Sequence, residues 1–313
     1  MNVPAINEST LRAVCDALRD PAVVSFVRDT VKAGYRECFR EHRESAASIA
    51  SEAFAALKTS QGDGVNPSAL LAVTTDLLRN VFRTHDKLFW FHVGYQQYKT
   101  LDKPEMDLAQ LKPLIPGNQI LDYGCGSGYL AARLDRAGYS VVTTDVLDYR
   151  YPDAQHLPFK VMRSASDICY PDDSADVTLI QAVLHHIDSD TLPTVLAKLR
   201  KVSSHLLIKE DTYGVPYEME GVSETLETQP LMRRFTAFPY ETQRKVLALI
   251  DYYANAIAQG VPEMHMPFSF RTPGEWKAVL EESGFRVTKS LVVGFEPGRM
   301  HKSCHVWLSC ERK

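Results

Sequence analysis

A glycine-rich run at residues 121–128, Leu-Asp-Tyr-Gly-Cys-Gly-Ser-Gly, constrains the fold of this chain more than any other segment. It follows a Pro-Gly turn and an apolar run that predicts a buried strand, and it precedes a helical pattern at 129–137. Glycine is needed where a backbone turns sharply or where a Cβ would strike a ligand. A strand, a bend and a helix start together present backbone N–H groups to a bound molecule. The expected loop glycines are Gly124, Gly126 and Gly128.

Two acidic residues make the glycine pattern more specific. Asp122 lies two positions before the first glycine, and Asp145 ends the next predicted strand, 140–145. The alternative is a dinucleotide-binding unit, whose glycines are spaced G-x-G-x-x-G around a diphosphate. In this chain the third glycine comes one residue earlier, and Asp122 would repel a diphosphate. The pattern therefore favours a different nucleotide-like cofactor.

The glycine loop with its two carboxylates resembles the class I S-adenosylmethionine (SAM)-dependent methyltransferases. The resemblance implies SAM as the cofactor. It implies that the first loop, with Asp122, holds the methionine end and that Asp145 holds the ribose hydroxyls. It also implies an α/β fold with a doubly wound, seven-stranded Rossmann-like sheet whose last strand is antiparallel.

A second segment, 176–187, resembles the fourth-strand motif of small-molecule methyltransferases. This resemblance places the backbone near Gln181 and Ala182 against the cofactor. The family's adenine loop corresponds to 164–167, where the usual Asp-Ala pair is replaced by Ser-Ala, so Asp167 is the expected adenine contact. The adjacent histidines of the motif point in divergent directions, and the family pattern accounts for them without a metal.

Composition excludes several classes of protein. The net charge is −4, no basic face stands out and no apolar run approaches ~20 residues, so we expect no nucleic-acid or membrane partner. The N-terminus has neither a signal core nor a transit pattern. The six cysteines form no C-x-x-C pair, which indicates a reduced cytoplasmic protein in which Cys125 is simply a small loop residue.

Strand and helix patterns alternate from residue 119 onward, which predicts a parallel sheet with right-handed crossovers. Ligands of such sheets bind at the carboxyl ends of the strands. The last two strands are joined by a short Pro-Gly turn and must be antiparallel. The expected strands are 119–123, 140–145, 159–163, 176–181, 204–210, 286–295 and 301–311.

Two further regions read as helical. Residues 1–112 form an expected N-terminal helical region, and 113–313 form the SAM-binding domain with a lid insertion at 212–272. The lid is expected to contain one helix, 240–258, and to enclose the acceptor with the N-terminal helices. The aromatic residues between 89 and 98 are expected to pack between the helical region and the sheet, in preference to lining the substrate pocket. They also make a homodimer plausible. The expected N-terminal helices are 10–19, 22–58, 67–83 and 86–99.

Three residues distant in the sequence suggest a metal site. His265 lies at the end of the lid, His301 on the terminal hairpin and Asp211 at the end of the fifth predicted strand. Two imidazoles and a carboxylate with open positions suit a divalent metal, zinc or iron, that binds a chelating substrate. The alternative is that both histidines are hydrogen-bonding groups of the pocket or lie on surface loops. The layout of residues 85–313 resembles C-methyltransferases of α-keto acids, some of which hold a metal through histidines.

The sequence therefore predicts a SAM-dependent methyltransferase of a small molecule, with metal-assisted C-methylation of an α-keto acid as the preferred reaction. An anionic acceptor would be anchored by Arg233, Arg271 or Arg299. A basic one, such as the arginine-derived keto acid, would pair with the lid carboxylates. The alternatives are a metal-independent O- or N-methyltransferase with a histidine base, and a SAM-binding protein without catalysis. The lid carboxylates are Glu218, Glu220 and Glu224.

Overall fold

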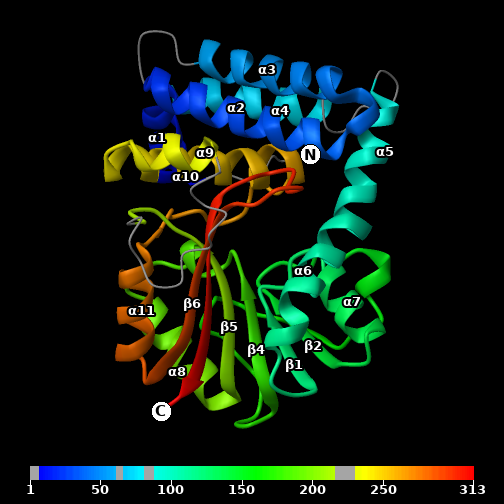
Figure 1. Ribbon diagram of the computed structural model, residues 1–313, viewed down its shortest axis with the longest axis vertical. Helices are drawn as coiled ribbons and strands as arrows, with labels where there is room; N and C mark the ends of the chain where they lie inside the picture. Colours follow the sequence, from blue (N-terminus) through cyan, green and yellow to red (C-terminus); the bar gives the residue numbers. More distant parts are fainter. Residues whose placement is uncertain (1–6, 61–65, 81–87, 216–229) are drawn as a thin grey trace. The chain divides into compact units, whose positions relative to one another are not determined.

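The chain folds into two compact units, which we call the helical unit and the sheet unit. The helical unit comprises residues 1–98, 224–270 and 294–304, and the sheet unit comprises 99–223, 271–293 and 305–313. The computed structural model describes residues 7–60, 66–80, 88–215 and 230–313 (Figure 1). Among these residues, no helix combines the length and the apolar character that crossing a bilayer requires.

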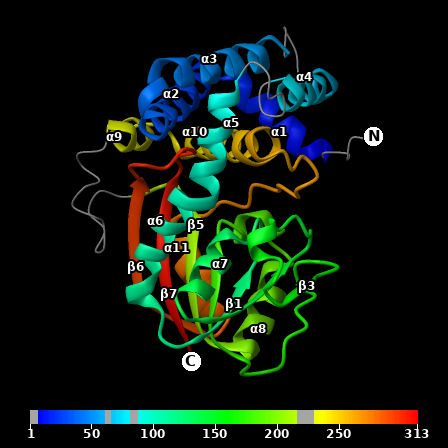
Figure 2. The same cartoon turned by 90° about the vertical axis from the view of Figure 1, so that its right-hand side faces the viewer.

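The sheet unit is built on a seven-stranded sheet with the order β3-β2-β1-β4-β5-β7-β6 (Figures 1 and 2). The first five strands pair in parallel, and β7 runs antiparallel to β5. This arrangement confirms the doubly wound sheet with an antiparallel last strand. The strands are β1 (Gln119–Tyr123), β2 (Ser140–Asp145), β3 (Phe159–Val161), β4 (Ala175–Gln181), β5 (Ser203–Asp211), β6 (Phe285–Phe295) and β7 (Cys304–Arg312).

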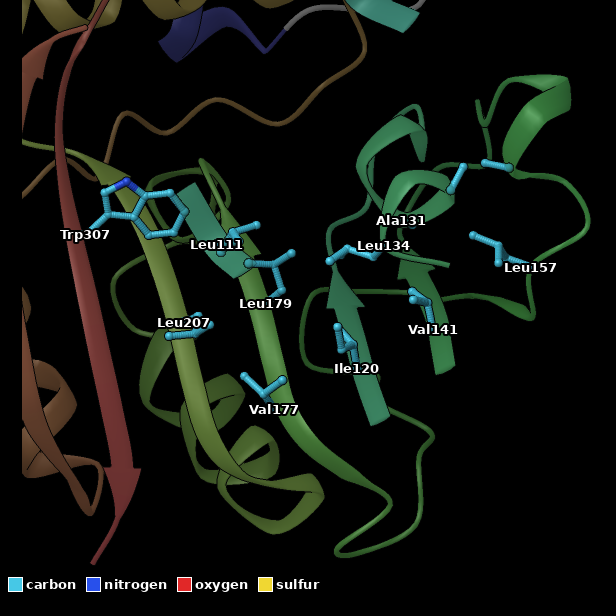
Figure 3. Close-up of a cluster of buried hydrophobic side chains, with 12 residues drawn as sticks. Leu111, Ile120, Ala131, Leu134, Val141, Leu157, Val177, Leu179, Leu207 and Trp307 are labelled. Atoms are coloured by element: carbon cyan, nitrogen blue, oxygen red, sulfur yellow. The ribbon is translucent and has the colours of Figure 1, made fainter. Parts of the chain in front are cut away.

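Helices cover the sheet because each places apolar side chains against its faces. A buried cluster contains Ile120, Val141, Val177, Leu179 and other residues from the central strands and their flanking helices (Figure 3). Most residues of the central strands are buried, as expected for strands covered on both faces. The helices are α6 (Lys103–Leu111), α7 (Tyr129–Arg136), α8 (Leu192–Val202) and α11 (Pro273–Glu282), with short helices η3 (Lys112–Leu114), η4 (Pro152–Ala154) and η5 (Leu184–His186).

The helical unit combines the N-terminal helices with residues 230–270 of the expected lid (Figure 1). Helix α10 packs against α1 and α2, and η6 packs against α4. The helices are α1 (Glu8–Arg19), α2 (Pro21–Cys38), η1 (Arg40–His42), α3 (Arg43–Thr59), α4 (Pro67–Asn80), α5 (Phe89–Gln97), α9 (Pro230–Thr236), α10 (Tyr240–Tyr252) and the π-helix η6 (Tyr253–Gln259). A second π-helix, η2 (Tyr98–Asp102), follows α5.

Two helix predictions differ from the structure. The expected helix 22–58 is two helices, because the chain leaves helical geometry at Phe39, whose ring stacks on Phe91 at 4.8 Å. The break depends on this tertiary contact, and no glycine or proline at the break predicts it from the sequence. The expected lid helix 240–258 is present as α10 followed directly by η6, but the expected lid also contains α9, so the prediction of one helix there was wrong. The role of 212–272 as a lid stays a prediction, and its residues 216–229, with Glu218, Glu220 and Glu224, lie outside the described residues.

The tip of the terminal hairpin lies in the helical unit and is held by α2. The Glu37 carboxylate accepts hydrogen bonds from Gly298 N (2.6 Å) and from the Lys302 ammonium (2.7 Å). Met300 N donates to the Tyr98 hydroxyl at 3.0 Å. These contacts keep residues 301–303 out of the ladder, so β7 begins at residue 304 rather than at the expected 301.

Gly34 of α2 permits this close approach, because a Cβ at that position would lie 2.1 Å from Met300 O. We expect Gly34→Ala to lower the free energy of unfolding by about 1–3 kcal/mol, the usual cost of overpacking, despite alanine's better helix propensity of about 1 kcal/mol. Gly274→Ala in α11 is the matched control, since a Cβ there meets nothing within 4 Å. Urea denaturation measures both, and a Gly34→Ala protein as stable as wild type would contradict this contact.

Candidate functional site

The glycine loop of the sheet unit joins β1 to α7 with a sharply bent backbone. Gly124, Gly126 and Gly128 have positive φ angles of 73°, 55° and 74°. L-residues with a side chain avoid this region, so the loop requires glycine. A Cβ at Gly124 would lie 2.5 Å from Val183, and one at Gly128 would lie 2.6 Å from the Ala154 Cβ. The three glycines therefore let the chain bend and approach its neighbours.

Asp145, at the carboxyl end of β2, faces this loop. One carboxylate oxygen accepts a hydrogen bond from Gly126 N at 2.8 Å, and the other accepts from Leu147 N at 3.2 Å. Burial raises the pKa of Asp145, and these N–H groups oppose the shift. Each carboxylate oxygen has a further lone pair, so Asp145 retains the capacity to accept ribose hydroxyls.

Asp122 lies under the loop and is 5% exposed. Burial, together with the charge of Asp145, raises its pKa to about 7. Burial also raises the pKa of the neighbouring Cys125 thiol well above its ordinary value. Cys125 therefore stays protonated at neutral pH, which suits a small loop residue and not a nucleophile.

The expected adenine loop is fixed by contacts from two other elements. The Tyr123 hydroxyl donates to Ala165 O at 2.6 Å, and Lys198 of α8 donates to Ser166 O at 2.6 Å. Asp167 accepts from Arg163 N at 3.1 Å, and this hydrogen bond lowers the pKa of Asp167. Asp167 therefore serves as a turn acceptor within its own loop, while its proposed adenine contact stays a prediction.

Gln181 and Ala182 end β4 beside the glycine loop. The Gln181 amide nitrogen is buried, and it has no hydrogen-bond partner among the described residues. Ala182 has a φ of 52°, which is unfavourable for alanine. A buried amide without a partner, a strained backbone and a glycine cradle occur together where ligands bind. The arrangement fits SAM, because Asp145 and Gln181 offer hydrogen bonds beside the glycine loop.

A buried polar cluster follows at the ends of β4 and β5. The Glu210 carboxylate accepts hydrogen bonds from Val183 N (2.9 Å) and Leu184 N (2.7 Å), and it contacts His185 Nδ1 at 2.6 Å. His185 Nε2 lies 3.6 Å from one oxygen of Asp211. The other Asp211 oxygen lies 3.6 Å from His305 Nε2 of β7. Sheet pairing places Asp211 directly opposite His305.

The sequence pointed to Asp211 but missed its neighbours. Glu210 was readable as an acidic residue at the end of a buried strand, whereas nothing in the sequence indicated His305. His185 was visible only as part of the fourth-strand motif. The structure shows it as a fully buried partner of Glu210.

The other two predicted metal ligands lie in the helical unit. His265 is exposed. His301 is partly buried, with its ring centroid 6.1, 6.1 and 6.0 Å from those of Tyr35, Tyr95 and Tyr253. Asp211 belongs to the sheet unit, so the ligand set His265, His301 and Asp211 stays a prediction.

The three candidate anchoring arginines differ in their surroundings. Arg233 is exposed on α9. Arg299 is 3% exposed and pairs with Glu296 at 3.4 Å. Arg271, in the sheet unit, donates to Ser189 Oγ at 3.0 Å, and burial lowers its pKa.

Comparisons with known proteins find one family match and several similar solved structures. Residues 121–205 match the family described as a methyltransferase domain. Similar solved structures include 1,6-didemethyltoxoflavin-N1-methyltransferase from Burkholderia thailandensis, with 15% identity over 76% of this chain and 88% of that chain and a TM-score of 0.45. Magnesium protoporphyrin IX methyltransferase from Synechocystis PCC 6803 has 16% identity over 76% of this chain and 94% of that chain, with a TM-score of 0.42. The comparison with curated proteins finds no match.

We expect Asp145→Ala to weaken SAM binding roughly tenfold or more, because losing a charge-assisted hydrogen bond costs about 1.5–3 kcal/mol. Glu311→Ala is the control. Glu311 pairs with Arg286 on the surface, and it lies opposite the amino end of β5, away from the carboxyl ends of the strands. Calorimetry measures both affinities. Unchanged SAM affinity in a folded Asp145→Ala protein would contradict the role of Asp145 as ribose acceptor. Binding of NAD in place of SAM would contradict SAM as the cofactor.

The raised pKa of Asp122 predicts a pH dependence of stability. Between its ordinary value of 3.8 and about 7, the folded protein holds a proton that the unfolded chain has lost. Stability contributed by this group therefore falls as pH rises through that window and is constant above it. Asp122→Asn removes the titration, so its stability relative to wild type should increase by about 2–3 kcal/mol from pH 5 to pH 8. Urea denaturation of the ligand-free proteins is the measurement, and parallel pH profiles would contradict the assignment.

Proposed function

We propose that this SAM-dependent methyltransferase transfers the methyl group to a small-molecule acceptor. The SAM-binding part of this proposal rests on one observation. The bent glycine loop faces Asp145 and lies beside the buried Gln181 amide. The small acceptor is supported by the fourth-strand resemblance and by the net charge of −4, since nucleic-acid-binding proteins usually carry a basic surface.

The reaction that we propose is C-methylation of an α-keto acid at the carbon next to its ketone. That carbon becomes nucleophilic only when it loses a proton, so the site must take up the proton and stabilise the resulting enolate. Asp211 supports this reaction, since it is 6% exposed and one of its oxygens has no hydrogen-bond partner among the described residues. A buried carboxylate of this kind suits either a metal ligand or a proton acceptor.

His265, His301 and Asp211 are the proposed metal ligands, and the donor set of two imidazoles and one carboxylate suits zinc or iron. A divalent metal bound there would stabilise negative charge on the substrate oxygens. Arg271 is the proposed anchor for an anionic acceptor, because it lies in the sheet unit and holds its position through Ser189. For a basic acceptor such as the arginine-derived keto acid, the partners would be Glu218, Glu220 or Glu224.

One observation favours a second candidate function, a metal-independent O- or N-methyltransferase. His305 Nε2 lies 3.6 Å from Asp211, and His305 remains partly exposed. A histidine oriented by a carboxylate can remove a proton from an acceptor hydroxyl or amine. His305 is the base in this alternative. A SAM-binding protein without catalysis is the third alternative, and any methyl transfer excludes it.

The test supplies SAM with a ¹³C-labelled methyl group and a panel of α-keto acids, including the arginine-derived one. We expect ¹³C on carbon by NMR, and bound zinc or iron by elemental analysis. Chelation, His265→Ala or His301→Ala should abolish transfer while SAM affinity stays within about twofold, because the ligands lie outside the glycine loop. His156→Ala is the control, since His156 is exposed and pairs with Asp135.

The outcomes separate the candidates. Full activity in metal-free protein, or methyl on oxygen or nitrogen, rejects metal-assisted C-methylation. Loss of that activity in His305→Ala then identifies the histidine-base mechanism. SAM binding without methyl transfer to any acceptor would indicate a SAM-binding protein without catalysis.

A further inference from the structure

We infer that Glu210 is a positioning residue that holds the turn after β4 in the strained form required for SAM binding. The inference rests on the assignment of this turn to the cofactor site. It extends that assignment to a side chain on a different strand, fully buried below the site.

The turn is strained at Ala182. Its φ of 52° lies in the left-handed region, which disfavours residues with a Cβ. Such a conformation persists only where surrounding contacts over-determine it, and it is concentrated at ligand-binding sites. Only one of those contacts is part of the sheet pattern, the hydrogen bond from Ala182 N to Lys209 O at 2.8 Å.

Glu210 supplies side-chain contacts to the turn, in addition to the backbone hydrogen bonds from His186 N to Val183 O (3.0 Å) and from Ile187 N to Leu184 O (3.1 Å). A single oxygen accepts the two consecutive N–H groups that follow the strained residue, those of Val183 and Leu184. The other oxygen contacts His185 Nδ1 at 2.6 Å. One carboxylate therefore binds three consecutive residues of the turn. Because Glu210 is on a paired central strand, it is itself fixed in place.

The turn in its strained form reaches the glycine loop. Val183 packs so closely on Gly124 that a Cβ on the glycine would lie 2.5 Å from the Val183 side chain. The same turn carries the buried Gln181 amide that has no hydrogen-bond partner among the described residues. A relaxed turn would move both residues away from the cofactor. Glu210 thus affects SAM binding by holding the backbone of the turn, and it does not contact SAM itself.

A matched control separates this positioning role from general stability. Asp176 begins the same strand, β4, and its carboxylate also accepts two consecutive N–H groups, Asn118 N at 2.7 Å and Gln119 N at 2.8 Å. It lies at the opposite, amino end of the strand. Asp176→Ala and Glu210→Ala therefore each remove a carboxylate that accepts two consecutive backbone N–H groups, at opposite ends of one strand, and Glu210→Ala also removes the contact with His185.

The experiment measures affinity for SAM and for S-adenosylhomocysteine by calorimetry, with melting temperature as a second readout. We expect Glu210→Ala to weaken binding at least tenfold, and Asp176→Ala to leave it within twofold even where the melting temperature falls. Glu210→Gln should weaken binding less than Glu210→Ala, because its amide oxygen can still accept the two N–H groups.

A rescue variant tests the strain directly. Glycine adopts a positive φ without penalty, so Ala182→Gly lowers the cost of the strained turn. In the Glu210→Ala background we expect Ala182→Gly to restore affinity at least threefold.

The inference is overturned if Glu210→Ala binds both ligands like wild type, if Asp176→Ala weakens binding equally, or if Ala182→Gly gives no rescue. If Glu210→Ala does not fold, the Glu210→Gln affinity relative to Asp176→Ala decides between the outcomes. Failure of the wild type to bind SAM would instead overturn the cofactor assignment itself, so the two failures are distinguishable.

Discussion

The hydrogen bond from Gly126 N to the Asp145 carboxylate is the interaction on which the cofactor site depends. It joins the bend after β1 to the end of β2, so two loops separated in sequence become one surface. The bond requires the parallel register that pairs Asp122 with Thr143, since this register brings the strand ends to the same height. It also requires glycine, because the loop turns through positive φ at three positions. The strand pairing, the glycines of the loop and the position of Asp145, the proposed ribose acceptor, are thus parts of one constraint.

Charged groups buried in both units are stabilised by specific partners. In the sheet unit Glu210 is enclosed by backbone N–H groups and His185. In the helical unit Lys302 is buried against Glu37. Burying a charge is unfavourable unless it is paired and hydrogen-bonded. These buried charges therefore fix the conformation of the segments that carry them, the turn after β4 and the hairpin tip. That tip carries His301 among three tyrosines.

The candidate site was predictable where its residues share one local motif. The glycines and Asp145 are close in sequence, and their spacing reflects the bend and the length of the next strand. Glu210, His185 and His305 were not predictable as a group, because their proximity arises from the pairing of β5 with β4 and β7. Asp211 was predicted as a site residue from its place at the end of β5. Its proximity to His305 depends on the antiparallel register of β5 with β7. A one-residue shift of that register would turn His305 to the other face.

The sequence alone determined the alternation of strands and helices in a doubly wound sheet and the position of the glycine loop, because hydrophobic periodicity and glycine content act over a few residues. Tertiary structure decided three other features. Phe39 divides the long N-terminal helix through contacts with α5, Glu37 and Gly34 hold the hairpin tip on α2, and Ala182 keeps a left-handed conformation through Glu210. Each depends on a contact at least 27 residues away in the sequence, and local propensity carries no information about which distant side chain will satisfy a backbone group.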